Sequence, residues 1–105
     1  MSRATEHGEI WEARVDKLRP VAIVSRDDVR GRRNKTTVAS ITTTIRGLQT
    51  EVFVDQRDGL GEASVVNCDE LNAIPKEWLV RRVGRLSRTK IDALDDALRL
   101  ALQLR

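Results

Sequence analysis

Five or six short segments rich in β-branched and apolar residues follow one another with only polar turns between them. Parallel strands need a crossover connection, usually a helix, so strands that follow one another through turns favour an antiparallel sheet. The sequence therefore predicts a mainly β fold, a small β-barrel that is closed by one helix at the C-terminus. The predicted strands are residues 8–15, 19–25, 36–43, 50–54, 64–71 and 79–86.

The C-terminal segment, residues 88–104, has helical periodicity, and Ser87 before it is a suitable N-cap. Leu100 and Leu104 lie off the main apolar stripe, so a second face of this helix is expected to need cover from a partner. The predicted stripe consists of Ile91, Leu94, Leu98, Ala101 and Leu102.

Length and composition limit the classes of protein to which the chain can belong. The 105 residues suffice for one domain, residues 1–105, of which residues 1–7 are expected to be disordered. One cysteine, Cys68, excludes an internal disulfide, and one histidine, His7, leaves little material for a histidine-based catalytic or metal site. Neither a membrane-spanning run nor a secretory signal is present, so a cytoplasmic location is expected.

Basic residues are concentrated in one predicted loop. The formal net charge is +3, and the segment 26–35 alone holds five basic and two acidic residues. Arginine predominates, which suits bidentate contact with phosphate. A solvated surface is the ordinary explanation for such a loop, and an anionic partner is the functional one.

Two motifs offer chemistry without a metal ion or another cofactor. Arg19-Pro20 opens the second predicted strand, and Thr42-Thr43-Thr44 ends the third. RNA supplies its own nucleophile, the 2′-OH, so a protein that cleaves it needs cationic and hydroxyl donors to stabilise charge on the phosphate, together with a route for the proton. An ordinary surface ion pair for Arg19 and simple β-propensity for the threonines are the structural alternatives.

Several pieces of the sequence, in order and at the right spacing, resemble the MazF (PemK-type) toxins of bacterial toxin–antitoxin systems. The resemblance extends from Gly8 to about Leu102. It is carried by residues 8–11 (GEIW), 19–25 (RPVAIVS), 38–48 (VASITTTIRGL), 50–52 (TEV), 59–60 (GL), 64–69 (SVVNCD), 79 and 81–87 (RRVGRLS).

The resemblance implies an SH3-like β-barrel with a C-terminal helix that works as a homodimer. It also implies a sequence-specific, metal-independent endoribonuclease that cuts single-stranded RNA, leaving a 2′,3′-cyclic phosphate and a 5′-OH. The substrate would be mRNA, or rRNA or tRNA. The family's catalytic arginine falls on Arg19, which would handle proton transfer and phosphate charge. Its catalytic threonine falls on Thr42, with Thr43 as the alternative.

The sequence departs from the family pattern at three places. The connection from Val15 to Arg19 is short, and Ser40 stands where proline is common. Asp69, Glu70 and Asn72 stand where members of the family vary and often place a glutamine that reads bases, so Glu70 is a candidate specificity residue. The residues expected to contact RNA are Trp11, Arg26, Arg32, Arg33, Thr43, Arg46, Ser64 and Glu70.

The family also implies an acidic, MazE-like antitoxin whose disordered segment would cover the toxin surface, and the 26–35 loop suits this partner as well as RNA. Two other functions remain possible from the sequence. A CcdB-like DNA gyrase poison would end in Trp-Gly-Ile, which this chain lacks. A non-catalytic SH3-like RNA-binding module would not need Arg19 and Thr42 to be paired.

Overall fold

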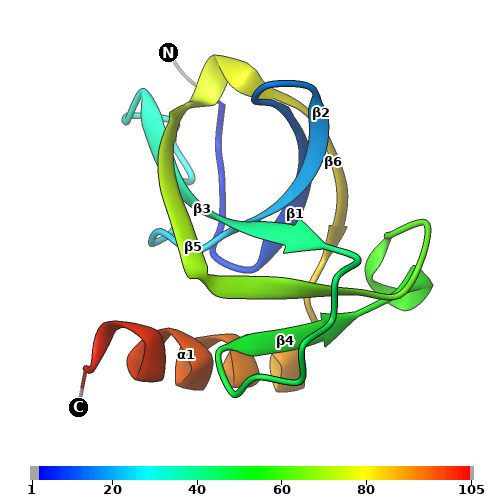
Figure 1. Cartoon of the computed structure of the whole chain (residues 1–105). Helices are drawn as coiled ribbons and strands as arrows, with labels where there is room; N and C mark the ends of the chain where they lie inside the picture. Colours follow the sequence, from blue (N-terminus) through cyan, green and yellow to red (C-terminus); the bar gives the residue numbers. More distant parts are fainter. Residues whose placement is uncertain (1–2, 105) are drawn as a thin grey trace.

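A single antiparallel sheet of six strands forms most of the molecule. The computed structural model describes residues 3–104, and the sheet curves strongly into a half-barrel that Figure 1 shows from its open end. Its strand order is β4-β5-β3-β2-β1-β6. The predicted fold class is confirmed. The strands are β1 (Glu9–Arg14), β2 (Leu18–Ile23), β3 (Lys35–Thr42), β4 (Glu51–Val54), β5 (Ser64–Pro75) and β6 (Leu79–Arg85).

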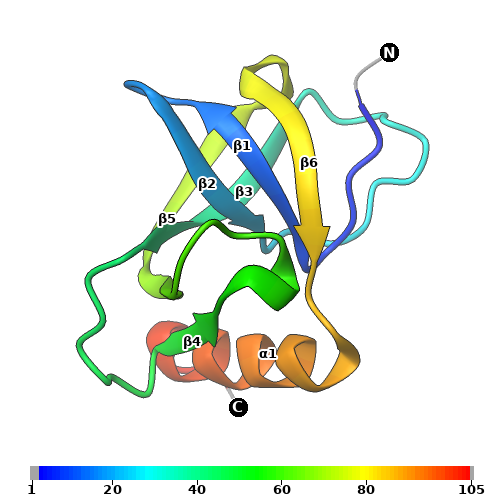
Figure 2. The same ribbon diagram turned by 90° about the vertical axis from the view of Figure 1, so that its right-hand side faces the viewer.

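The C-terminal helix α1 (Arg88–Leu102) packs across β4 and β5 (Figures 1 and 2). Ser87 is its N-cap, as predicted, and accepts a hydrogen bond from the Lys90 amide. Leu94 and Ala97 are buried. Leu102, which was predicted on the buried stripe, is 52% exposed, because the last turns of α1 extend beyond β4. Among residues 3–104, no helix is long and apolar enough to cross a membrane.

Two apolar clusters hold this arrangement together. One lies between the curved sheet and α1, and the other fills the inside of the barrel around Trp11 and Ile23. Alternation along the strands explains this division, since successive side chains point to opposite faces of a sheet. Ile10 and Trp11, neighbours on β1, accordingly belong to different clusters.

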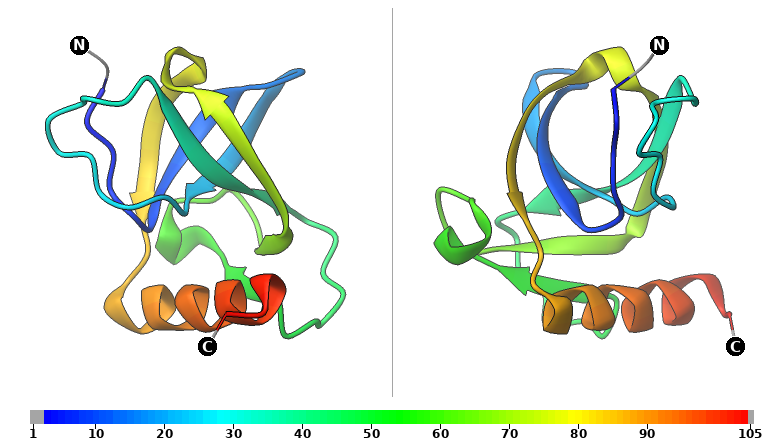
Figure 3. Two further views of the ribbon diagram at one scale, coloured as in Figure 1. Left: turned by 90° about the vertical axis from the view of Figure 1, so that its left-hand side faces the viewer. Right: turned by 180° about the vertical axis from the view of Figure 1, so that it is seen from behind.

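The N-terminal segment crosses the back of the barrel and is not disordered over residues 3–7. Residues 1–7 were expected to be disordered, and this expectation is wrong for residues 3–7. Met1 and Ser2 lie outside the described part. Thr5 forms a β-bridge with Asp28, and the Lys76 ammonium donates to the Arg3 carbonyl oxygen at 2.8 Å. His7 Nε2 lies 2.6 Å from an Asp95 carboxylate oxygen on α1. Figure 3 shows the segment (dark blue) beside the 24–34 loop (cyan).

Two glycines make a close backbone crossing between β6 and the β4–β5 connection, where η1 (Gln56–Asp58) lies. A Cβ atom on Gly84 would lie 1.9 Å from the Asp58 carbonyl oxygen, and Gly59 has a φ of 98°. Only glycine fits both positions. A glycine inside a strand indicates a bulge or a close backbone approach. Gly84 shows the close approach, and the register of β1 and β6 also shifts there.

The pairing of β2 with β3 ends early, and this opens the sheet. The ladder stops at Val21 and Ser40, although β1 continues to pair with β2 as far as Leu18. Pro20 has no backbone N–H, which suits the point where a ladder ends. The last residues of β3 instead pair with β5, so the start of β2 and the end of β3 separate and leave a groove between them.

Candidate functional site

A groove of about 770 Å³ lies where β2 and β3 separate. Its walls come from the β1–β2 turn, β2, β3, β5 and the loop before β5. Five of the ten residues predicted to act on or bind RNA line it: Arg19, Thr42, Thr43, Ser64 and Glu70. The fold thus brings together the two proposed catalytic residues, which are 23 positions apart in the sequence.

Arg19 is held by a carboxylate at the rim of the groove. Its Nε donates to Asp16 Oδ1 at 2.7 Å and its Nη2 donates to Asp16 Oδ2 at 3.0 Å. This two-point contact raises the pKa of the Arg19 guanidinium, and the charges of Asp16 and Glu70 raise it further. The hydrogen bonds from Arg19 and the Lys17 amide lower the pKa of the Asp16 carboxyl far below its usual range. Arg19 therefore stays protonated, and its orientation is fixed.

Thr42 is the last residue of β3 and is half-buried. Its Oγ1 accepts a hydrogen bond from the Thr44 amide at 3.1 Å. Since the hydroxyl accepts there, its proton remains free to be donated to another group. Thr43 also lines the groove, but it lies beyond the strand and is exposed. Of the two threonines, Thr42 is the one whose position the fold fixes.

A bulge in β5 places Glu70 in the groove. Ala39 pairs with Leu71 and Ser40 with Asn67, so residues 68–70 have no partner on β3. Such bulges redirect side chains next to functional sites. Glu70 is exposed, and its side chain forms no ion pair or hydrogen bond with any residue from 3 to 104. It lies close enough to raise the pKa of Arg19. Ser64, buried on the same strand, donates its hydroxyl proton to the Glu62 carbonyl oxygen at 3.0 Å.

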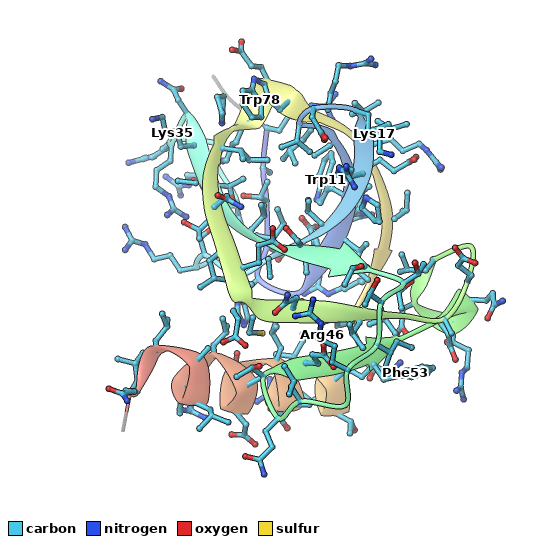
Figure 4. The ribbon with its side chains drawn as sticks, viewed as in Figure 1. Trp11, Lys17, Lys35, Arg46, Phe53 and Trp78 are labelled. Atoms are coloured by element: carbon cyan, nitrogen blue, oxygen red, sulfur yellow. The ribbon has the colours of Figure 1, made fainter. Side chains whose placement is uncertain are left out.

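The other predicted RNA-binding residues lie away from this groove. Trp11 is only 8% exposed, donates its indole N–H to Glu9 Oε1 at 3.1 Å, and lines a separate cavity of about 400 Å³. The guanidinium of Arg3 lies 5.3 Å from the centroid of the Trp11 ring. Arg46 is exposed in the β3–β4 loop, labelled in Figure 4, and is not part of the groove wall.

Arg26, Arg32 and Arg33 lie in the β2–β3 loop, which follows the last residue of β2. Arg19 is at the opposite end of the same strand. The basic loop therefore does not lie beside Arg19. The reason is topological, since an antiparallel β2–β3 hairpin places its connecting loop at the end of the strands away from Arg19 and Thr42.

One residue of the groove was missed in the sequence, namely Asp16. The segment 16–18 was assigned only a connecting role. A carboxylate three residues before an arginine, at the entrance to a strand, was the available signal. The role of Asp16 becomes clear from its two-point contact with Arg19, which only the conformation of the turn creates.

A small half-barrel that brings an arginine and a threonine hydroxyl to one groove defines a class of protein that can stabilise negative charge on a bound group. Comparison with known proteins identifies the family within this class. Residues 6–102 match the model of the PemK-like, MazF-like toxins of type II toxin–antitoxin systems. The chain belongs to this family.

Individual relatives agree with this assignment. The chain is 47% identical over 92 residues to endoribonuclease MazF3 of Mycobacterium tuberculosis, covering 88% of this chain and 89% of the relative. The solved structure of the M. tuberculosis toxin MazF-mt6 is 45% identical, with a TM-score of 0.87 over 92% of this chain and 98% of that one. A mycobacterial endoribonuclease solved in complex with its cognate antitoxin shares the fold at 24% identity, with a TM-score of 0.85 over 96% and 97% of the two chains.

Proposed function

We propose that the groove between β2 and β3 is the active site at which this chain, a MazF-type endoribonuclease toxin, cleaves single-stranded RNA. The observation that carries the proposal is that Arg19 from β2 and Thr42 from β3 line the same groove, which the early end of the β2–β3 ladder opens. The substrate supplies the 2′-OH as nucleophile. Its oxygen attacks the phosphorus, the bond to the 5′-oxygen breaks, and the products carry a 2′,3′-cyclic phosphate and a 5′-OH.

Arg19 and Thr42 act on the charge of the transition state. A protonated guanidinium donates to the non-bridging phosphate oxygens, where negative charge accumulates, and the free Thr42 proton supplies a second donor. Asp16 positions Arg19, so little reorganisation is needed when the phosphate arrives. No metal ion or other cofactor is required in this mechanism.

Glu70 accepts the proton from the 2′-OH. Arg19 is unsuited to that task because Asp16 raises its pKa and keeps it protonated. Asp16 is also a poor base, since its own pKa is strongly lowered by Arg19. Glu70 lines the groove, lies near Arg19, and has no partner between residues 3 and 104. Its proton then passes to solvent, and a water molecule protonates the leaving 5′-oxygen.

The family and the exposed surface support a proposal for the biological setting. The toxin works in the cytoplasm, on mRNA or on rRNA or tRNA, and a cognate acidic antitoxin of the MazE type inhibits it. It acts as a homodimer, and the exposed leucines at the end of α1 and just after it are suited to an interface. Leu100 is 50% exposed and Leu104 is 59% exposed.

The test is cleavage by purified protein in EDTA, with mapping of the 5′-OH ends. Wild type should cut a transcript at a short recurring motif. Arg19→Ala and Thr42→Ala should each lose about 10²-fold or more in rate, as expected for removal of a preorganised donor. Activity that requires added Mg²⁺, or an Arg19→Ala protein that cuts normally, would overturn this mechanism. RNA binding without any cleavage by wild type would indicate a non-catalytic module.

A further inference from the structure

Cations without carboxylate partners are concentrated in the β2–β3 loop, residues 24–34, and at Lys35, where β3 begins. From Arg57 to Leu104, every lysine and arginine forms an ion pair with an aspartate or glutamate. In contrast, Arg26, Arg30, Arg32 and Lys35 are exposed and form no ion pair with any residue from 3 to 104. The molecule thus pairs its cations on α1 and β6 but leaves four of the five in segment 26–35 without a carboxylate, since only Arg33 pairs there, with Asp28. The other cations without an ion pair among residues 3–104 are scattered: Arg3, Arg14, Lys17 and Arg46.

A buried carboxylate fixes the backbone of this loop. Asp28 Oδ1 accepts the Arg32 amide at 3.0 Å, and Asp28 Oδ2 accepts the Arg33 amide at 2.9 Å. The same Oδ2 accepts the Lys76 ammonium at 2.5 Å, and Lys76 is only 1% exposed. The β-bridge from Asp28 to Thr5 ties the loop to the N-terminal segment. The four cations without an ion pair therefore project from an ordered platform, residues 24–35.

The platform is separate from the groove. Lys35 begins β3 and Thr42 ends it, and seven residues of strand span about 23 Å. Figure 4 labels Lys35 and Lys17, from the groove rim, on opposite sides of the barrel. One phosphate cannot contact both regions, whereas a longer RNA chain can.

We propose that Arg26, Arg30, Arg32 and Lys35 form a second docking surface for RNA, which binds backbone phosphates away from the cut site. This inference rests on the proposed function. The composition of the surface favours RNA over a protein segment. A disordered protein that orders on binding needs several apolar anchors. This loop exposes a single large apolar side chain, Val29, which is too few for such a partner. Phosphate contacts need none, and arginine matches phosphate in two-point hydrogen bonding.

The test compares two substrates. One is a long transcript with a mapped cut site, and the other is a short oligonucleotide of the same cut motif that fills only the groove. The variant is Arg26→Gln with Arg30→Gln and Arg32→Gln. The matched control is Arg81→Gln with Arg88→Gln and Arg99→Gln, which removes the same charge from ion-paired positions.

The loop variant should lose about 10- to 100-fold in kcat/KM on the transcript at 0.1 M salt. The slope of log(kcat/KM) against the logarithm of the salt concentration should become shallower by about 2. Cleavage of the short oligonucleotide should be unchanged, and the control should cut both substrates normally. Equal cleavage of the transcript by wild type and the loop variant would overturn the inference, even if antitoxin affinity fell. Equal losses on both substrates would also overturn it. Failure of wild type to cut the short oligonucleotide would instead overturn the proposed function.

Discussion

Arg19 and Asp16 form a two-point ion pair at the entrance of β2, with N–O distances of 2.7 and 3.0 Å. Both side chains are largely exposed, so the pair adds little to stability. Its effect is to hold a protonated guanidinium at the groove that Glu70 also lines. The predictions below depend on this arrangement.

Asp16→Asn should lower the cleavage rate roughly 10- to 100-fold, because a guanidinium without its orienting partner spends less time in the productive geometry. Single-turnover kinetics should show the loss in the chemical step, with RNA affinity nearly unchanged or higher as a negative charge is removed. Asp92→Asn, which breaks the exposed ion pair with Arg88 on α1, is the control and should be silent. A loss confined to RNA affinity would argue against a positioning role.

Thr42 and Thr43 should differ in their importance. Thr42→Ala removes a hydroxyl whose orientation the Thr44 amide fixes, and we expect a loss of about 10²-fold or more in rate. Thr42→Ser should retain much of the activity, since it keeps the donor. Thr43→Ala should change the rate far less. Comparable losses for the two alanine variants would show that the groove uses both hydroxyls.

Glu70→Gln should slow cleavage about 10²-fold or more, because glutamine fills the same space and cannot accept the proton of the 2′-OH. Single-turnover kinetics should place the loss in the chemical step, with RNA affinity nearly unchanged. A normal rate with an altered cut motif would instead support the base-reading role expected for Glu70 from the sequence.

Stability should fall in acid through Asp28. The Lys76 ammonium and the Arg33 and Arg32 amides hold the pKa of the Asp28 carboxyl well below its usual range. The unfolded chain therefore binds a proton at higher pH than the folded one, so this contribution is full at neutral pH and is lost as pH falls below about 4. Asp28→Asn should lower the thermal midpoint at pH 7, and its difference from wild type should shrink toward pH 3. Asp96→Asn, from an exposed pair on α1, should match wild type throughout.

The chain should be a dimer at micromolar concentration, because exposed leucines on α1 need cover. Light scattering of wild type should give about twice the mass of one chain. The double variant Leu100→Ser with Leu104→Ser should lower the measured mass toward that of a single chain. A wild-type mass of a single chain would contradict the homodimer. A double variant that remains dimeric would place the interface elsewhere, for example on the β3–β4 side where Leu48 and Phe53 are exposed.

Local patterns in the sequence determined most of the secondary structure. Short segments rich in β-branched and apolar residues predicted all six strands within a few residues, and Ser87 predicted the start of α1. Glycine at position 84 predicted a close backbone approach. These features depend on neighbouring residues, whose side-chain direction and backbone freedom can be inferred directly. Order and spacing of motifs also identified the family, with Arg19 and Thr42 as its catalytic candidates.

Tertiary structure decided what surrounds those two residues. The groove exists because the β2–β3 ladder ends at Val21 and Ser40 while β3 continues along β5. The basic loop is separate from it, and the N-terminal segment is ordered through contacts such as that of Arg3 with Lys76, 73 positions away. Strand register and pairings between distant segments arise from packing of the whole chain, and the periodicity of a single sequence does not encode them.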